Sequence, residues 1–494
     1  MKKTAAILLA MVLCLGAVCA QALTMTGLET ETVSRDWSEH KFFARMEELT
    51  GVPVQAQGMT DAAQYAQLLA EMERGEIKTD VLFKANLTRA QEIALSGSGA
   101  LIDLAPLIDE HMPNLSALLI AHPEWKETIT LDDGRIVSLP LLNSRERQVM
   151  VWINKAWLDK LGIAMPGSVD ELTAALEAFM EKDPNGNYKQ DEIAADLTGV
   201  FEMRWLLPYF GVVADDYNIA RNAQGEIVFA PQMPEYRAFI ECLADWCEKG
   251  ILPREAFTAA HSAALLDEPD ENAPVTSGMI VSMTPYTVIS VDAVEQYEAL
   301  LMPAPDGKTR WRDFLGCVWP GCFAVTSACE NPAEALKWVD ALYGENGALL
   351  AYGGVEGEDY LVNENGLWSF NTNAWRDVNS FRSEILIYTG IATPGLYPSD
   401  FVEHVDSAPD QHVFAENSRV HAVAERVTQP YCLTTEAQTT ADALALELGE
   451  LVDVGIARFA TGEVELNDET YAAWLDELNA AGSAELTALF ADAE

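Results

Sequence analysis

Residues 23–83 decide the fold class, and they read LTMTGLETETVSRDWSEHKFFARMEELTGVPVQAQGMTDAAQYAQLLAEMERGEIKTDVLF. Residues 23–33 alternate in roughly period two, which is typical of a strand. Shorter strands are predicted at 52–57 and 80–83, and amphipathic helices at 38–50 and 61–74. This order of strand, helix, strand, helix and strand indicates an α/β fold with a mostly parallel sheet and right-handed crossovers.

The loops after the first and third strands are the first places to look for a ligand site. Ligands of open α/β sheets bind beyond the carboxyl ends of the strands. These loops carry Arg35-Asp36-Trp37 and Lys84-Ala85-Asn86. Charged, aromatic and amide side chains are therefore expected at that edge of the sheet.

A second α/β unit begins near residue 144. A strand is predicted at 149–154, and Ser168 with Glu171 predicts a capping box at the start of a helix. Turn residues at 132–134 predict a hairpin, further strands are predicted at 278–283 and 323–326, and the C-terminal third is helical. We expect two lobes crossed by short connections.

The composition is that of a globular protein with a strongly acidic charge balance. The chain has 494 residues, of which 49% are hydrophobic and 22% charged. There are 31 Lys and Arg against 77 Asp and Glu, which gives a net charge of −46. Because this field repels nucleic-acid phosphates and anionic lipid surfaces, we expect neither as a partner.

The first 22 residues predict the compartment. Lys2 and Lys3 precede an apolar run at 5–20 that ends in Ala20-Gln21-Ala22, the pattern of a secretory signal peptide. We therefore expect residues 1–22 to be removed and the mature protein to act outside the cytoplasm. Lipid anchoring at Cys19 stays open, although Val18 departs from the small residue that precedes the lipidated cysteine of bacterial lipoproteins.

One loop carries oxygen-bearing side chains at regular spacing, as a hard cation requires. The candidate calcium ligands are Asp183, Asn185, Asn187, the backbone carbonyl of Lys189, Asp191 and Glu192. Tyr188 stands where a calcium loop favours glycine, and Ala194 stands where it favours a bidentate glutamate. The spacing favours calcium, and a polar turn without a metal is the alternative.

Several stretches resemble the extracellular solute-binding proteins, family 1, of ABC transporters. The nearer relatives are the long members that include the alginate- and other oligosaccharide-binding proteins. The resemblance covers nearly the whole mature chain, and the 183–192 loop is its most specific part. The matching stretches are VWINK at 151–155 with WLDKLG at 157–162, DVLF at 80–83 with GALIDL at 99–104, GVEG at 354–357 ahead of Tyr360, and FATGE at 459–463 with Trp474-Leu475.

The resemblance implies a two-lobed periplasmic-binding-protein-like fold, in which a hinge closes the lobes on a ligand in a central cleft. It implies a structural calcium ion in the 183–192 loop, an oligosaccharide ligand, ABC permease subunits as partners, and a monomer. The implied lobes are 23–143 plus 310–370 for the first, and 144–309 plus 371–494 for the second.

Family-like cleft positions coincide with the loops already singled out. Sugar rings stack their C–H faces on aromatic rings, and their hydroxyls meet polar side chains. Core packing is the alternative for each tryptophan. The basic residues suit a sugar carboxylate, but salt bridges to acidic neighbours are the simpler explanation. The implied ligand-binding residues are Trp37, Lys84, Asn86, Arg145, Arg204, Trp205, Tyr286, Trp319 and Trp375.

Two alternatives compete with a sugar-binding transport protein. A glycosidase with paired carboxylates is one, but no carboxylate pair is distinguished by its neighbours, and the chain has no GxSxG or HExxH motif. A solute-binding protein for a peptide or a cationic solute is the other. The sequence favours a non-enzymatic component of an ABC importer, which captures an oligosaccharide by lobe closure and delivers it to the permease.

Overall fold

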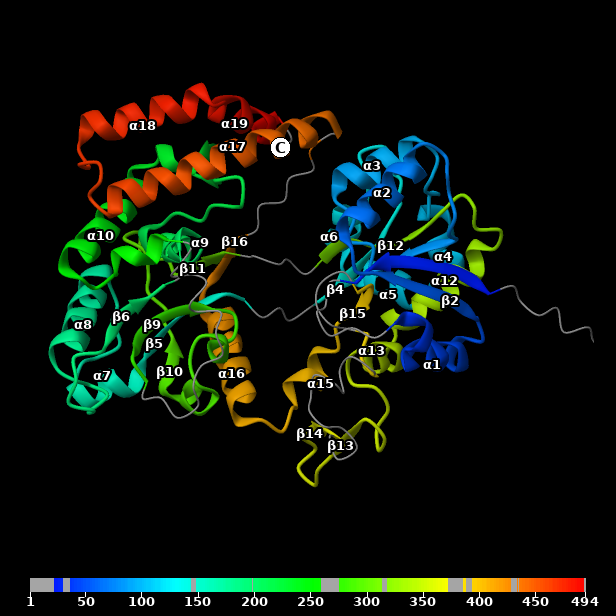
Figure 1. Cartoon of the computed structure of the whole chain (residues 1–494), viewed down its shortest axis with the longest axis horizontal. Coiled ribbons are helices and arrows are strands. Elements are labelled where there is room, and N and C mark those ends of the chain that lie inside the picture. The colour runs from blue at the N-terminus through cyan, green and yellow to red at the C-terminus, as the bar shows by residue number, and fades with distance from the viewer. Residues whose placement is uncertain are drawn as a thin grey trace, which may run out of the picture.

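The chain forms two lobes, each built around its own β-sheet (Figure 1). The computed structural model describes residues 22–29, 36–143, 148–197, 199–258, 275–312, 318–371, 385–387, 393–427, 433 and 435–492. Cys19 and nearly all of the predicted signal peptide lie outside these ranges. Among the described residues, no helix combines the length and apolar character that a bilayer span requires.

The first lobe contains the predicted α/β unit around a six-stranded sheet. Its strand order is β15-β4-β12-β3-β1-β2, and β12 alone runs antiparallel to its neighbours. The strands are β1 (Leu23–Leu28), β2 (Val54–Met59), β3 (Val81–Phe83), β4 (Leu139–Leu142), β12 (Val318–Val325) and β15 (Gly395–Leu396). The predicted order of strands and helices at the start of the chain is confirmed.

Helices cover the sheet of the first lobe, and their ends follow the expected capping residues. Asp61 accepts hydrogen bonds from the first backbone N–H groups of α2, and Gly51 ends α1 in the left-handed conformation. Leu49 of α1 is 44% exposed, whereas Phe42, Phe43 and Met46 of the same helix are buried. The helices are α1 (Lys41–Thr50), α2 (Ala62–Glu73), α3 (Arg89–Gly97), α4 (Ala105–His111), α5 (Pro113–Ala121), α6 (Pro123–Ile129), α12 (Pro332–Asp340) and α13 (Glu345–Tyr352), and a hairpin of β13 (Tyr360–Val362) and β14 (Trp368–Phe370) follows.

The second lobe has a four-stranded sheet of order β10-β5-β9-β6 and a larger helical layer. Its strands are β5 (Met150–Asn154), β6 (Ile193–Asp196), β9 (Ser277–Ser282) and β10 (Tyr297–Ala299), with the pairs β7 (Ile219–Arg221)–β8 (Ile227–Phe229) and β11 (Arg310–Arg312)–β16 (Glu425–Val427). Its helices are α7 (Lys155–Leu161), α8 (Val169–Glu181), α9 (Val200–Met203), α10 (Pro234–Lys249), α16 (Ala408–Val423), α17 (Thr435–Ala460), α18 (Asp468–Ala480) and α19 (Ser483–Asp492).

Two local predictions need correction. Residues 132–134 form a turn closed by Gly134 N–H donating to Leu131 O, but the chain runs from α6 into β4 there, so the turn does not join a hairpin. At the start of α8, Ser168 accepts from Glu171 N–H as predicted. The Glu171 carboxylate, however, accepts from Gly167 N–H at 2.8 Å instead of closing a capping box with Ser168.

Strand pairing differs from the implied lobe boundaries in two places. β15 falls within 371–494 but pairs with β4 in the first sheet, where Tyr397 N–H donates to Leu142 O. β11 falls within 310–370 but pairs with β16 of the second lobe. The chain therefore returns to the first lobe for β15 and leaves it again through the short helix α15 (Ser399–Glu403) into α16.

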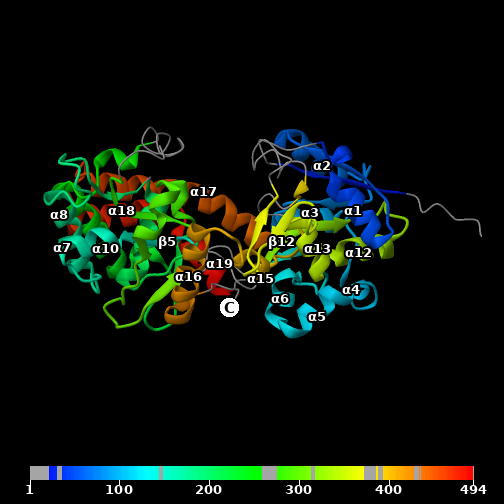
Figure 2. The same cartoon turned by 90° about the horizontal axis from the view of Figure 1, so that it is seen from below.

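Two features link the lobes besides the crossing segments. A cluster of apolar side chains joins Leu141 of the first sheet, Tyr397 and Val402 near α15, and Phe414 of α16. On another side, α17 packs on α10 and α19 in the second lobe and also contacts α3 of the first lobe, as Figures 1 and 2 show. The edge of the first sheet where β4 ends and β12 begins faces the second lobe.

Candidate ligand-binding face and cation loop

A buried ion pair lies at the carboxyl ends of β1 and β3. The ammonium of Lys84 is 3.1 Å from the carboxylate of Glu29, and the two residues are 2% and 6% exposed. The second carboxylate oxygen of Glu29 accepts the Trp37 indole N–H at 3.0 Å. Burying a charge is unfavourable unless it is paired and hydrogen-bonded, and this network meets both conditions. It ties the start of the 84–88 loop to the end of β1.

Trp37 is part of the first-lobe core in this conformation. Its side chain is 1% exposed and packs against Phe83 and Phe43. A Cβ atom at Gly58 would lie 2.7 Å from the indole ring, so glycine there leaves room for the ring. Core packing, the alternative to ligand binding, therefore describes the position of Trp37 in this structure. Contact between Trp37 and a ligand stays a prediction.

The loop after β3 holds two non-glycine residues in the left-handed region. Lys84 has φ 49° and Asn86 has φ 47°, a conformation that costs about 1 kcal/mol or more for each residue. The loop is held by Leu87 N–H donating to Gly321 O at 3.0 Å, and a Cβ at Gly321 would lie 2.1 Å from Leu87 O. The Asn86 side chain is exposed. The anchored loop therefore presents an amide beyond the sheet edge.

The predicted second-lobe residues Arg204 and Trp205 lie in a charged and aromatic group. Arg204 forms an ion pair with Asp453, so the salt-bridge explanation holds for it. Trp205 is 6% exposed, and the guanidinium carbon of Arg312 lies 5.3 Å from the centre of its ring. Phe201 of α9 meets the edge of the same indole and is half exposed. Arg312 also forms an ion pair with Asp216, so the group is a paired cation beside a buried indole, and Phe201 supplies its exposed aromatic surface.

The remaining predicted ligand residues are dispersed. The Tyr286 hydroxyl donates to Asp410 at 2.9 Å, which links the second sheet to α16. Trp319, at the start of β12, is half-buried against the apolar cluster between the lobes. Arg145 and Trp375 lie outside the described residues. Among the predicted residues that the structure describes, Trp37 is joined to Lys84 through Glu29, and that the set forms one site stays a prediction.

Three residues of these groups were missed in the sequence: Glu29, Phe201 and Arg312. Glu29 ends an otherwise uncharged strand, and an acid at that point was a usable sign of a partner for Lys84. Arg312 belongs to the short motif RWR directly before the chain crosses between lobes. No sequence pattern distinguishes Phe201 from a core aromatic residue.

The 183–192 loop folds around its first aspartate. The carboxylate of Asp183 accepts from the backbone N–H groups of Gly186, Asn187 and Tyr188, at 2.9, 3.1 and 3.0 Å. Asp183 and Tyr188 have φ of 45° and 61°. Tyr188 therefore adopts the left-handed conformation that the loop requires, although it is not glycine, and its side chain is 95% exposed.

Three of the candidate cation ligands are hydrogen-bonded to one another within this loop. The side-chain amides of Asn185 and Asn187 both lie 3.0 Å from the Asp191 carboxylate. Hydrogen bonds from Asn187 and Asn185 hold the pKa of Asp191 below its ordinary value, so the group stays ionised. Both carboxylate oxygens of Glu192 are buried without a hydrogen-bond partner. Such a carboxylate needs a compensating charge, and this donor set of hard oxygens fits a calcium ion.

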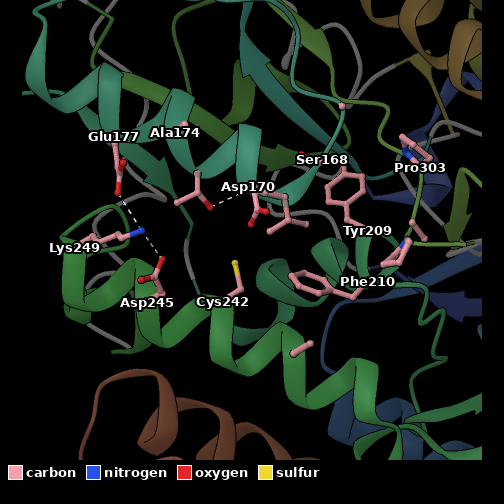
Figure 3. A pocket seen from close by; sticks show the side chains of 16 residues that line it. Ser168, Asp170, Ala174, Glu177, Tyr209, Phe210, Cys242, Asp245, Lys249 and Pro303 are labelled. Atoms are coloured by element: carbon pink, nitrogen blue, oxygen red, sulfur yellow. Dashed lines mark hydrogen bonds and ion pairs between the residues drawn. The ribbon is translucent and has the colours of Figure 1, made fainter. Parts of the chain in front are cut away.

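A second charged group lines a cavity of about 710 Å³ in the second lobe (Figure 3). It lies between α8 and α10, on the side away from the first lobe (Figure 1). Lys249 bridges Glu177 and Asp245 at 3.1 and 2.8 Å. The Cys242 thiol points into the cavity, and burial raises its pKa to about 12, which keeps it protonated and unreactive. The paired charges and inert thiol favour a structural role.

The chain belongs to the bacterial extracellular solute-binding protein family, whose model matches residues 37–348. The fructooligosaccharide ABC transporter substrate-binding protein FusA of Streptococcus pneumoniae is 28% identical over 350 residues. That alignment covers 67% of this chain and 62% of the relative, less than two thirds of its length.

Solved structures show the same two-lobed architecture over nearly the whole chain. FusA in complex with kestose is 21% identical with a TM-score of 0.71, and the match covers 96% of this chain and 98% of that one. An HMO-binding solute-binding protein from Bifidobacterium longum infantis is 19% identical with a TM-score of 0.79, covering 95% and 98%. The alginate-binding protein AlgQ2, solved without calcium ion, is 20% identical with a TM-score of 0.70, covering 96% and 97%. Another structure of FusA is of an EF-hand mutant with fructo-nystose.

Proposed function

We propose that this protein is the extracytoplasmic solute-binding component of an ABC importer and captures an oligosaccharide between its lobes. The observation that carries the proposal is the edge of the first sheet. Five parallel strands end there, the chain crosses to the second lobe there, and the anchored loop presents Asn86 beyond it. Ligands of such sheets bind at that edge.

The ligand class is supported by the relatives. FusA is named for fructooligosaccharides, and the matched Bifidobacterium protein is described as HMO-binding. This supports a sugar over a peptide or a cationic solute. Asn86 would meet sugar hydroxyls, and the group around Phe201, Trp205 and Arg312 would supply aromatic surface from the second lobe.

We also propose that the 183–192 loop holds a structural calcium ion. Its ligands would be Asp183, Asn185, Asn187, the Lys189 carbonyl, Asp191 and Glu192. The support is the orphaned Glu192 carboxylate and the left-handed conformation at Tyr188. The bound ion would compensate the buried negative charge of Glu192, and it takes no part in a reaction.

The compartment and partners follow from the same proposal. A signal peptide at 1–22 would export the chain, lipid anchoring at Cys19 remains open, and ABC permease subunits would receive the ligand from a monomeric binding protein. We propose no catalytic activity, so a bound glycan should be recovered unchanged.

The test is calorimetric titration of the mature protein with a panel of glycans in the presence of calcium. The bound glycan is then recovered and analysed. We expect saturable stoichiometric binding of one glycan class without turnover. A ligand at 100 times its dissociation constant would raise the free energy of unfolding by about 2.7 kcal/mol.

Asn86→Ala tests the contact directly, with Lys78→Ala as the control because Lys78 forms an exposed pair with Glu71 away from the sheet edge. We expect Asn86→Ala to weaken glycan binding several-fold and to lower the melting temperature only slightly, because alanine tolerates the left-handed conformation less well than asparagine, and Lys78→Ala to change neither. Binding of peptides or polyamines alone would overturn the sugar assignment, and glycan cleavage would overturn the transport assignment.

A further inference from the structure

A cavity of about 550 Å³ lies on the first lobe beyond the end of β15. Its walls come from α13, from the β13–β14 hairpin that follows it, and from α15. The volume is within the range of about 300–1,000 Å³ typical of small-molecule sites. The residues that matter for its chemistry are Glu345, Tyr360, Trp368, Tyr397, Asp400 and Phe401.

The cavity opens at the same edge of the sheet as the 84–88 loop. β1, β3, β4 and β15 all run parallel, so their carboxyl ends share one edge. From β3 the strand order passes through β12 and β4 to β15. Three strand spacings separate Asn86 from the cavity, which is about 14 Å. An extended ligand lying along this edge would meet both.

Contacts connect the cavity to the middle of that edge. The Ser399 hydroxyl, in the cavity wall, is 3.4 Å from the side-chain oxygen of Asn143 at the end of β4. Trp319 packs against the cluster that contains Tyr397 and Phe401. The cavity therefore adjoins the point where the chain crosses between the lobes.

The lining has the chemistry of a sugar site. The rings of Trp368 and Phe401 stack with centroids 4.4 Å apart, and the indole N–H donates to Phe401 O. Trp368 is only 4% exposed, so it supports the half-buried Phe401 ring, which forms the aromatic part of the wall. Glu345 and Asp400 stand exposed at opposite walls as acceptors for hydroxyl groups. Burial, and then the nearby Glu356, raise the pKa of the Tyr360 phenol, which keeps it a neutral hydroxyl. Aromatic surface with a few placed polar groups is typical of ligand pockets.

We propose that this cavity is a distal subsite for the far end of an oligosaccharide whose other end lies at the 84–88 loop. The ligand is then longer than a disaccharide, and the β13–β14 hairpin and α15 determine which lengths bind well. This inference rests on the proposed function and adds the length of the ligand to it.

The test is calorimetric titration with ladders of fructo-, malto- and manno-oligosaccharides, each from disaccharide to hexasaccharide. We expect one ladder to bind, with affinity rising by at least about tenfold once the chain is long enough to reach the cavity. The double variant Glu345→Ala/Asp400→Ala should abolish that step and leave the affinity for the shortest member unchanged. Glu364→Ala, an exposed residue in the hairpin turn that does not line the cavity, is the matched control.

The outcomes separate the two proposals. If no ladder binds the wild-type protein, the proposed function fails and the subsite fails with it. If a ladder binds without a length step, or the double variant weakens all lengths equally at an unchanged melting temperature, the subsite is wrong and the proposed function stands. The subsite is supported if affinity rises with ligand length in the wild-type protein and in Glu364→Ala, and if this rise is lost in the double variant.

Discussion

Two loops of this protein each hold two non-glycine residues at positive φ, but different interactions stabilise them. Lys84 and Asn86 in the first lobe, and Asp183 and Tyr188 in the second, are four of the five non-glycine residues with positive φ in the described chain. The first loop is fixed by a buried ion pair and backbone hydrogen bonds. The second is fixed by an aspartate that gathers backbone N–H groups, while Tyr188 points into solvent.

The difference shows what each loop needs to keep its shape. The loop after β3 is held by partners that the protein itself supplies, so it is prearranged before any ligand arrives. The 183–192 loop is also held by hydrogen bonds to Asp183, but it leaves the Glu192 carboxylate buried without a partner. Its shape is therefore expected to depend on an external cation. The following experiments test this contrast, beginning with the largest expected effect.

Removing the cation of the buried pair should have the largest effect. Lys84→Met leaves the Glu29 carboxylate buried without its charge partner, and we expect the free energy of unfolding to fall by about 3–5 kcal/mol. Urea denaturation measures this loss. Adding Glu29→Gln should recover part of it, because the uncompensated charge is then gone.

The exposed pair Lys78–Glu71 is the matched control for that experiment. Its N–O distance is 2.9 Å, and Lys78 is 63% exposed. Lys78→Met should change the stability far less than Lys84→Met, because solvent screens an exposed pair. Equal losses in the two variants would show that burial of Lys84 does not hold the loop.

Calcium should stabilise the second loop and leave the first unaffected. At 100 times the dissociation constant, the ion should raise the free energy of unfolding by about 2.7 kcal/mol. Thermal melting with calcium and after chelation measures the shift, which Asp183→Ala should abolish. Lys84→Met should keep the calcium shift on its lower baseline. A wild-type melting temperature insensitive to chelation would favour the metal-free polar turn.

Replacing the strained tyrosine should stabilise the calcium-free loop. Tyr188→Gly removes the penalty of a left-handed conformation, and we expect a gain of about 1 kcal/mol. Tyr188→Ala is the control, since it removes the exposed ring but keeps a Cβ atom at positive φ. If both variants behave alike, the ring rather than the backbone determines the effect.

The comparison also shows which features can be predicted from sequence. Two features are local patterns and are therefore visible in the sequence: the spacing of oxygen-bearing residues in 183–192, and the succession of strands and helices along the chain from β1 to β3. The pairing of Lys84 with Glu29 and the place of β15 in the first sheet depend on contacts between distant residues. Trp37 illustrates the limit, because it lies in a predicted ligand loop but its ring packs between Gly58 and the core aromatics.

The smallest effect concerns the ionisation of Asp191 in the calcium-free loop. Hydrogen bonds from Asn187 and Asn185 lower its pKa below the ordinary 3.8. A group with a depressed folded pKa contributes stability above the unfolded pKa and loses it as the pH falls through the folded value. Asn187→Ala should raise the Asp191 pKa toward 3.8, measured by NMR titration of the carboxyl carbon. Asp133, whose pKa is lowered by Arg135 far from this loop, should titrate unchanged and serves as the internal control. An Asp191 pKa that does not move in the variant would show that the amides do not donate to the carboxylate in solution, and the hydrogen-bonded arrangement of the calcium-free loop would then be wrong.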